Sequence, residues 1–212
     1  MSPPKTTKLV EETRQALFDA ARETFAKDGF QGARVDRIAE RAGVNKALIN
    51  YHFGGKKRLF HAIIEDLTRT LAQSLRDAID PDAPPERQLR CFIRHMAANV
   101  KDHPEFPRLL LLETVEEDPI PDGPPQHLAQ VLEIMAGIIE KGQRLGVFKP
   151  MNPFFAHMHL VSSFALYQLT GPLRDRVAEL TALPEHSLSM DHFIAFVEEQ
   201  IMAGFMVTPP KE

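Results

Sequence analysis

A cluster of polar residues near position 50 has side chains that can read the edges of DNA bases. Lys46 and Asn50 lie four residues apart, so a helix through them presents both side chains on one face. An Asn side chain matches the major-groove edge of adenine with two hydrogen bonds, and a Lys can donate to the acceptors of guanine. Ala47 and Leu48 can contact thymine methyl groups, with partial burial as the alternative for Leu48. We therefore expect these four residues to contact bases, with Asn50 and Lys46 as the main readers.

Three neighbouring residues suit the DNA backbone better than the bases. Tyr51, His52 and Lys56 offer a hydroxyl, an imidazole and an ammonium group. Such groups bond to phosphate oxygens and fix position without encoding sequence. Each of them alone could be an ordinary surface side chain, but their joint spacing with Lys46 and Asn50 favours a DNA contact.

Two short helices around a glycine turn would position these side chains. The first has an apolar stripe at helical spacing, formed by Val35, Ile38, Ala39 and Ala42. Gly43 ends it, because glycine accepts backbone angles that other residues resist. Asn45 can cap the second helix, in which Ile49 and Phe53 would be buried. This is the pattern of a helix-turn-helix.

Composition indicates a protein that folds without metals or disulfides. The chain has 212 residues, 43% of them hydrophobic, and one cysteine, Cys91, which excludes an internal disulfide. No signal-peptide pattern opens it, so we expect a cytoplasmic protein. The uncharged run from Pro150 to Leu173 contains Asn, His, Gln, Gly and additional Pro residues, so we do not expect it to span a membrane.

Charge is distributed unevenly along the chain. The formal net charge is −4, but residues 1–60 contain 12 Lys and Arg against 7 Asp and Glu, a local net charge of +5. The remainder is therefore acidic, at −9. A local basic face is what phosphate binding requires, whereas proteins that coat DNA without specificity are usually basic throughout.

The rest of the chain reads as helices, and we expect an all-α fold of about nine helices. Further helices are predicted at Leu9–Lys27, Lys56–Ile79, Glu86–Asp102, Phe106–Glu117, Gln126–Leu145, Phe154–Thr170, Arg174–Leu183 and Asp191–Phe205. An N-terminal three-helix bundle at 9–55 would hold the helix-turn-helix. A larger domain would follow at 56–206, between polar tails at 1–8 and 207–212.

The stretch GFQGARVDRIAERAGVNKALINYHFGGKKRLF, from Gly29 to Phe60, resembles the DNA-binding signature of the tetracycline-repressor (TetR) family of transcriptional regulators. The resemblance implies a family domain at about 11–71. It also implies a homodimer that binds double-stranded operator DNA and a small-molecule effector in the C-terminal domain. Asn45 stands where the family often has serine. Arg34 lies near a usual threonine, whose phosphate contact it could supply.

By resemblance, the C-terminal half should hold an effector pocket and a dimer surface. We expect the pocket around Phe92, Met96, Leu109, Leu110, Glu113, Met135, His159 and Phe164. Such Met and Phe stripes are also typical of plain core, and Glu113 could equally be a solvated helix end. For the dimer interface we expect two late helices, through Phe155, Val161, Leu166, Phe193, Phe196, Val197, Ile201 and Phe205.

By resemblance we expect a ligand-responsive repressor that releases a palindromic operator when a small molecule binds the C-terminal domain, although activators share this sequence pattern. Two other functions compete with it. A helical enzyme finds little support, because Cys91 has no local nucleophile motif and no phosphate-binding glycine loop is present. His157 and His159 point about 200° apart on a helix and cannot share a metal. We therefore expect no catalytic residue, cofactor or metal. A non-specific architectural DNA binder conflicts with the acidic C-terminal part.

Overall fold

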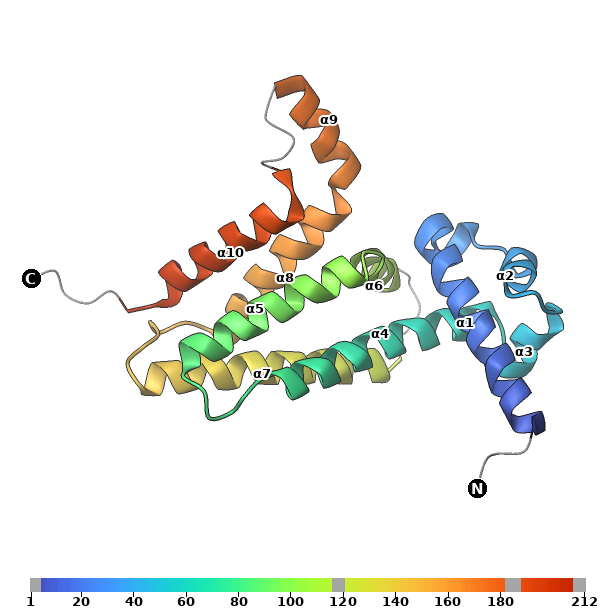
Figure 1. The fold of residues 1–212 in the computed structure, drawn as a ribbon, viewed down its shortest axis with the longest axis horizontal. Coiled ribbons are helices and arrows are strands. Elements are labelled where there is room, and N and C mark those ends of the chain that lie inside the picture. Colours follow the sequence, from blue (N-terminus) through green and yellow to red (C-terminus); the bar gives the residue numbers. More distant parts are fainter. Residues whose placement is uncertain (1–4, 116–120, 182–187, 208–212) are drawn as a thin grey trace, which may run out of the picture. The chain divides into compact units, whose positions relative to one another are not determined.

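The computed structural model describes residues 5–115, 121–181 and 188–207, which form ten helices (Figure 1). Within these ranges the only strand-like pairing is one isolated antiparallel bridge, Phe148 with Met206. The predicted all-α class is confirmed. The helices are α1 Lys5–Gly32, α2 Val35–Ala42, α3 Ala47–Phe53, α4 Lys56–Ala78, α5 Pro85–Asp102, α6 Phe106–Val115, α7 Gly123–Arg144, α8 Pro153–Leu169, α9 Gly171–Thr181 and α10 Met190–Phe205.

Most boundaries differ from the predicted ones by a few residues. The first helix begins at Lys5, inside the predicted N-terminal tail, and is interrupted at Gly29, where φ is 71°. Glycine adopts this positive φ without the strain that a Cβ would add. The predicted helix ends at Glu117 and Leu183, together with residues 1–4 and 208–212 of the two tails, lie outside the described residues.

The chain forms two compact units. Unit 1 comprises Met1–Thr68 and Arg108–Pro125, and unit 2 comprises Arg69–Pro107 and Gln126–Glu212. Unit 1 thus extends past the predicted domain boundary at Lys56 and takes in residues from much later in the chain. The long helix α4 contributes to both units.

Unit 1 is built around α1, α2, α3 and the first half of α4 (Figure 1). Its interior contains three phenylalanine rings in mutual contact. The ring of Phe25 lies 5.1 Å from that of Phe60 in an edge-to-face arrangement and 6.0 Å from that of Phe30. Ile38 and Ile49, from the two helices of the turn motif, are fully buried or nearly so. Aromatic contacts of this kind give a small bundle a well-defined core.

Helix α6 joins unit 1 through contacts with α1 and α4. Nη1 of Arg108 donates a hydrogen bond to the carbonyl oxygen of Ala26 (2.6 Å), just before the interruption of α1. The carboxylate of Glu113, which is buried, lies 3.3 Å from Nε2 of His61 on α4. Arg108 thus connects α6 to the carbonyl groups of Ala26 and Lys27, just before the Gly29 interruption of α1.

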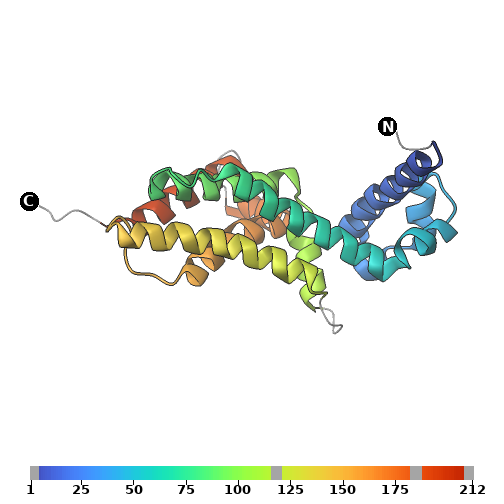
Figure 2. The ribbon, with the colours of Figure 1, turned by 90° about the horizontal axis from the view of Figure 1, so that it is seen from below.

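In unit 2, α7 runs beside the second half of α4, as Figures 1 and 2 both show. Nη2 of Arg76 donates to Oε1 of Gln130 (3.0 Å) between them. Helix α5 contacts both α8 and α10. The core side chains of unit 2 include Phe92, Met135 and Phe164, each 0–1% exposed. These helices bury one apolar face each, as their sequence periodicity predicts.

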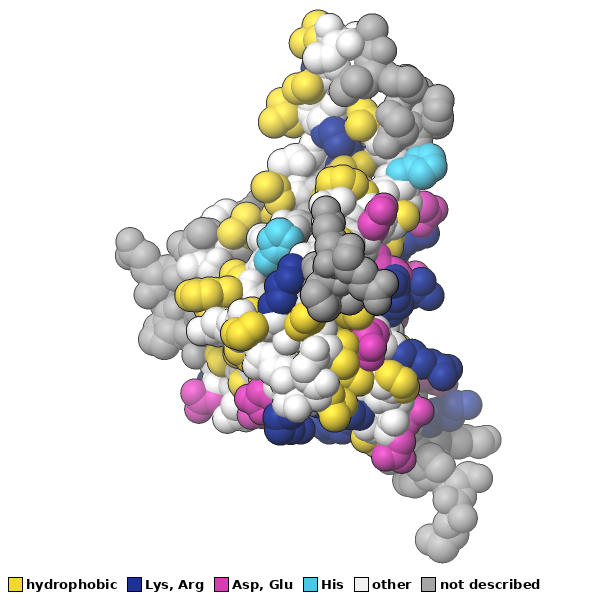
Figure 3. Space-filling model, turned by 90° about the vertical axis from the view of Figure 1, so that its left-hand side faces the viewer, with side chains coloured by type: hydrophobic (Ala, Val, Ile, Leu, Met, Phe, Trp, Pro, Cys, Tyr) yellow, Lys and Arg dark blue, Asp and Glu magenta, His cyan; other side chains and the backbone are white. Residues whose placement is uncertain are grey.

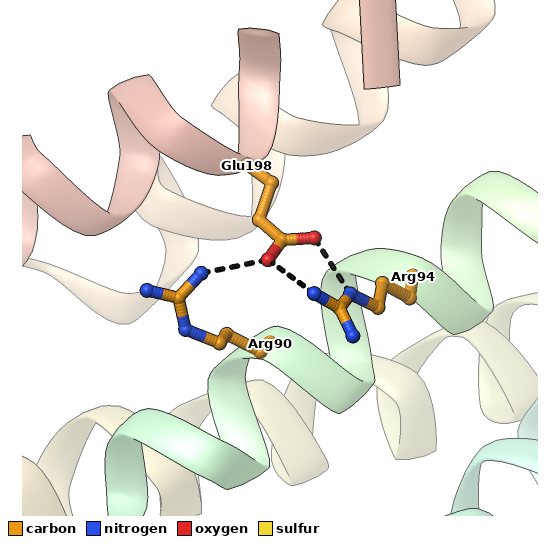
Figure 4. Close-up of polar contacts among 3 residues, drawn as sticks. All are labelled: Arg90, Arg94 and Glu198. Carbon is orange, nitrogen blue, oxygen red and sulfur yellow. Dashed lines mark hydrogen bonds and ion pairs between the residues drawn. The ribbon is translucent and has the colours of Figure 1, made fainter. Parts of the chain in front are cut away.

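A carboxylate with two arginine partners connects α5 to α10 (Figure 4). Glu198 is buried on α10, and its Oε1 accepts from Nη1 of Arg90 at 2.7 Å. Arg94, one turn further along α5, donates through Nε and Nη2 at 2.8 and 2.9 Å. The hydrogen bonds from Arg94 are the largest influence that lowers the pKa of Glu198, and those from Arg90 act in the same direction. The carboxylate is therefore charged in the folded protein at neutral pH.

None of the helices in the described ranges combines the length and the apolar character needed to cross a membrane.

Candidate DNA-binding site

The two helices predicted around Gly43 are present as α2 and α3. Gly43 has φ 67° and donates its backbone N–H to the end of α2, which turns the chain toward α3. Oδ1 of Asn45 accepts from the backbone N–H of Ala47 at 2.9 Å, so Asn45 supplies the predicted cap-like contact. Gly54, at φ 74°, ends α3. The short helix is therefore preceded by the predicted cap residue Asn45 and ended by Gly54.

Helix α3 has an inner and an outer face. Ile49 and Phe53 are 1% and 9% exposed and pack the helix against the rest of unit 1. The outer face presents every predicted base-reading residue except Leu48, which is half-buried; Lys46, Ala47 and Asn50 are exposed. Such an arrangement lets a helix enter a DNA groove while its buried side fixes its orientation.

The predicted phosphate contacts lie beside this outer face. Tyr51 is 74% exposed, and its ring meets that of His52 edge-to-face at 5.0 Å. Lys56, at the start of α4, is half-buried and its Nζ lies 4.6 Å above the ring of Phe30. Arg34 is exposed immediately before α2. The nine predicted residues thus all belong to unit 1, and whether each one touches DNA stays a prediction.

An acidic residue that sequence reasoning missed lies next to these groups. Oδ1 of Asp36 is 3.0 Å from Nζ of Lys46, and its Oδ2 is 4.0 Å from Nη2 of Arg34. The hydrogen bond and charge of Lys46 lower the pKa of Asp36. No local pattern could have identified the pair with Lys46, because Asp36 lies in α2 and Lys46 lies ten positions later, directly before α3.

The predicted effector residues divide between the two units. Phe92, Met96, Met135 and Phe164 are buried in unit 2, whereas Leu109, Leu110 and Glu113 belong to unit 1. Glu113 is not a solvated helix end, since it is 5% exposed and paired with His61. His159 is exposed on α8, and its predicted place at the effector pocket stays a prediction.

His157, two residues earlier, points inward instead. Its ring lies 6.3 Å from that of Phe92 in an edge-to-face arrangement, and its buried Nδ1 has no hydrogen-bond partner among the described residues. Burial lowers the pKa of His157, which favours the neutral imidazole. The two histidines lie about 200° apart around the helix, so the sequence left open which of them faces the core.

The predicted dimer residues also fall into two groups. Phe155, Leu166 and Phe196 are 68%, 62% and 57% exposed on α8 and α10. Val161, Phe193 and Phe205 are half-buried. Val197 and Ile201 are 5% and 1% exposed, so they are core residues of the single chain and the expectation for them is wrong. Their stripe on α10 faces the helices of its own unit.

Figure 3 shows exposed hydrophobic side chains on one face of the structure. They continue over the upper part of the view, where α9 lies. Leu173, Val177 and Leu180, at helical spacing on α9, are 65%, 48% and 73% exposed. Sequence reasoning did not include α9 in the dimer surface.

No group of three or more His, Cys, Asp or Glu side chains that could hold a metal ion occurs in the parts of the chain that the structure describes.

Comparison with known proteins agrees with this geometry. Residues 17–63 match the family described as bacterial regulatory proteins, tetR family. Residues 85–173 match a tetracycline repressor-like C-terminal domain. The HTH-type transcriptional repressor SCO4008 of Streptomyces coelicolor is 31% identical over 171 residues, which cover 79% of this chain and 83% of that protein.

Two further relatives extend the likeness to nearly the whole chain. The HTH-type transcriptional regulator RutR of Escherichia coli K12 is 25% identical over 198 residues, 93% of this chain and 90% of that protein. The fold is similar to that of the transcriptional regulator FadR from Bacillus subtilis, solved in complex with stearoyl-CoA, with a TM-score of 0.69 and 19% identity. That match covers 90% of this chain and 98% of the other. The chain belongs to the TetR family of transcriptional regulators.

Proposed function

We propose that this protein is a homodimeric repressor that binds a palindromic operator and releases it when a small molecule binds unit 2. The observation that carries the DNA-binding part is the outer face of α3. It combines the exposed Asn50 and Lys46 with a buried inner side that fixes the helix. A single helix reads only a few base pairs, so sufficient affinity and site length require two copies on a two-fold site.

The apolar surface of α8 and α10 supports the homodimer. The two helices contact each other and expose Phe155, Met158, Leu166 and Phe196. Large exposed apolar patches on soluble domains mark interaction sites. Two copies related by a two-fold axis would bury these side chains in a bundle of four helices, which also suits a two-fold operator.

The interior of unit 2 supports an effector that is largely apolar and has at least one hydrogen-bonding group. Phe92, Met96, Met135 and Phe164 provide apolar surroundings, and Nδ1 of His157 beside Phe92 has no hydrogen-bond partner in the described parts of the chain. Such a combination, mostly apolar with few polar groups, is typical of small-molecule sites. The transcriptional regulator FadR, which is similar in fold and was solved in complex with stearoyl-CoA, supports an effector with an apolar part.

The course of the chain supports a link between effector and DNA. The sequence passes between the two units within α4, α6 and α7. On the unit 1 side, α6 is bonded to α1 through Arg108 and to α4 through Glu113. An effector that favours one arrangement of α6 and α4 would change the population of DNA-competent dimers by its differential affinity for the two arrangements.

Selection of bound duplexes from random DNA tests the proposal. We expect a palindrome whose half-sites are about 34–36 Å apart, centre to centre, or a multiple of that spacing. Recovery of duplexes with no shared motif would favour an architectural binder. Recovery of a single unrepeated half-site would contradict the dimer.

A further inference from the structure

We propose that Asp36 is a specificity-determining residue of the DNA-binding site, which restrains Lys46 and Arg34 in the free protein and opposes binding to DNA of the wrong sequence. The inference rests on the proposed DNA-binding function and concerns the residue that limits it. Asp36 itself is not one of the residues proposed to contact DNA.

The geometry places one carboxylate between two predicted DNA contacts. Asp36 lies in the first turn of α2, and its two oxygens lie 3.0 Å from Nζ of Lys46 and 4.0 Å from Nη2 of Arg34. Lys46 directly precedes α3, and Arg34 directly precedes α2. A single acidic side chain therefore compensates cations at the start of both helices of the motif.

All three side chains are accessible to a DNA molecule. The side chains of Asp36, Lys46 and Arg34 are 59%, 67% and 81% exposed. Exposed ion pairs are weak because water and salt screen them, so phosphate or base acceptors can replace the carboxylate. The neighbouring Lys46 lowers the pKa of Asp36, so the opposing charge persists at neutral pH.

This arrangement affects specific and non-specific binding differently. Non-specific affinity comes almost entirely from cations that replace the counterions of the phosphates. A fixed carboxylate beside two such cations lowers that affinity on every sequence. On the operator, base contacts by Asn50 and Lys46 add free energy that the wrong sequence does not supply. On the operator alone, Asp36 also offsets its own charge penalty, because it limits the positions that Lys46 samples and so favours the geometry of the base contact.

The test compares three variants on the selected operator and on a random duplex of the same length, by fluorescence anisotropy at several salt concentrations. Asp36→Asn removes the carboxylate charge. Asp36→Glu keeps it. Glu23→Gln is the matched control, because Glu23 makes an exposed ion pair with Arg41 in the same unit and its loss changes the net charge equally.

For Asp36→Asn we expect binding to the random duplex to strengthen about threefold and its salt dependence to steepen by about one phosphate contact, so that the preference for the operator falls. Asp36→Glu should retain the wild-type preference, and Glu23→Gln should change it less than Asp36→Asn. Thermal unfolding of each variant shows whether the substitution destabilises the first turn of α2. A loss of stability alone would not alter the ratio of the two affinities.

Equal changes in both affinities for Asp36→Asn, or the same loss of preference in Glu23→Gln, would overturn the role of Asp36 and leave the proposed function intact. A wild-type protein that prefers no duplex over random DNA would instead overturn the proposed function, and the role of Asp36 with it.

Discussion

The two units place comparable ion pairs in opposite surroundings. In unit 1 the carboxylate of Asp36 and its partner Lys46 are both more than half exposed. In unit 2 the side chain of Glu198 is 10% exposed and accepts hydrogen bonds from Arg90 and Arg94. An exposed pair can exchange partners at little cost, whereas a buried carboxylate that loses its partners is strongly destabilising. The first arrangement suits a site that must bind a polyanion, and the second suits a permanent connection between helices.

Removing both arginine partners of Glu198 should give the largest effect on stability. The double variant Arg90→Ala, Arg94→Ala leaves a buried carboxylate unpaired on α10. We expect the free energy of unfolding, measured with urea, to fall by about 3 kcal/mol. A change of the size seen at exposed pairs would show that the contrast between the two units is wrong.

The same group gives a dependence on pH. Because the pKa of Glu198 is lowered in the folded state, its stabilising contribution is present above the unfolded value of about 4.5. It is lost as the pH falls through the folded pKa. The double arginine variant should lack this acid-induced loss, which a urea series below pH 5 would measure.

Disrupting the apolar face of α8 and α10 should weaken operator binding without unfolding unit 1. Phe196→Glu introduces a charge where the side chain is 57% exposed in the single chain. We expect a monomer by sedimentation and at least about tenfold weaker operator binding, which corresponds to about 1.4 kcal/mol. Leu145→Glu is the control, since Leu145 is 62% exposed and follows the end of α7. If Leu145→Glu dissociated the protein and Phe196→Glu did not, the proposed interface would be misplaced.

Replacing His157 should change the free energy of unfolding by a smaller amount, and it should stabilise the fold. His157→Leu removes a buried nitrogen that has no partner in the described residues, so we expect unfolding to cost roughly 1 kcal/mol more at pH 7. The response to the effector should weaken, because the proposed hydrogen-bonding group is gone. His95→Leu is the contrast, since it leaves the hydroxyl of Ser74 without its 2.9 Å contact and should destabilise the fold.

The pH dependence of the free energy of unfolding provides a second test of these histidines. Burial lowers the pKa of His157 and His95 below the unfolded value of about 6.5. The unfolded state therefore binds more protons just below pH 6.5, and stability should fall as the pH decreases through that region. His157→Leu should reduce this slope. An unchanged slope would show that His157 does not titrate differently on folding.

Local sequence signals predicted unit 1 better than unit 2. Gly43 has the positive φ value that its position in the sequence suggested, and Ile49 and Phe53 are buried as the spacing indicated. These features depend on neighbouring residues. The bond from Arg108 to Ala26 joins residues 82 positions apart, and no local pattern contains that information.

In unit 2, the sequence periodicity identified the apolar faces of the helices. It could not distinguish faces that pack within the chain from faces that would pack against a second copy. Val197 and Ile201 form an apolar stripe that faces the interior of the same chain, while Phe196 beside them is exposed. A helix with apolar residues on several sides gives the same pattern whether its partner is its own domain or a second copy. Only the packing of α10 against α5 and α8 distinguishes them.

The most direct test of the account measures how Asn50→Ala changes the preference for the selected operator over a random duplex of equal length. Asn50 is exposed on the outer face of α3. We predict a loss of preference of roughly tenfold or more, because a bidentate base contact contributes about 1–3 kcal/mol, with random-duplex affinity little changed. A variant that keeps the full wild-type preference would contradict base reading by the outer face of α3.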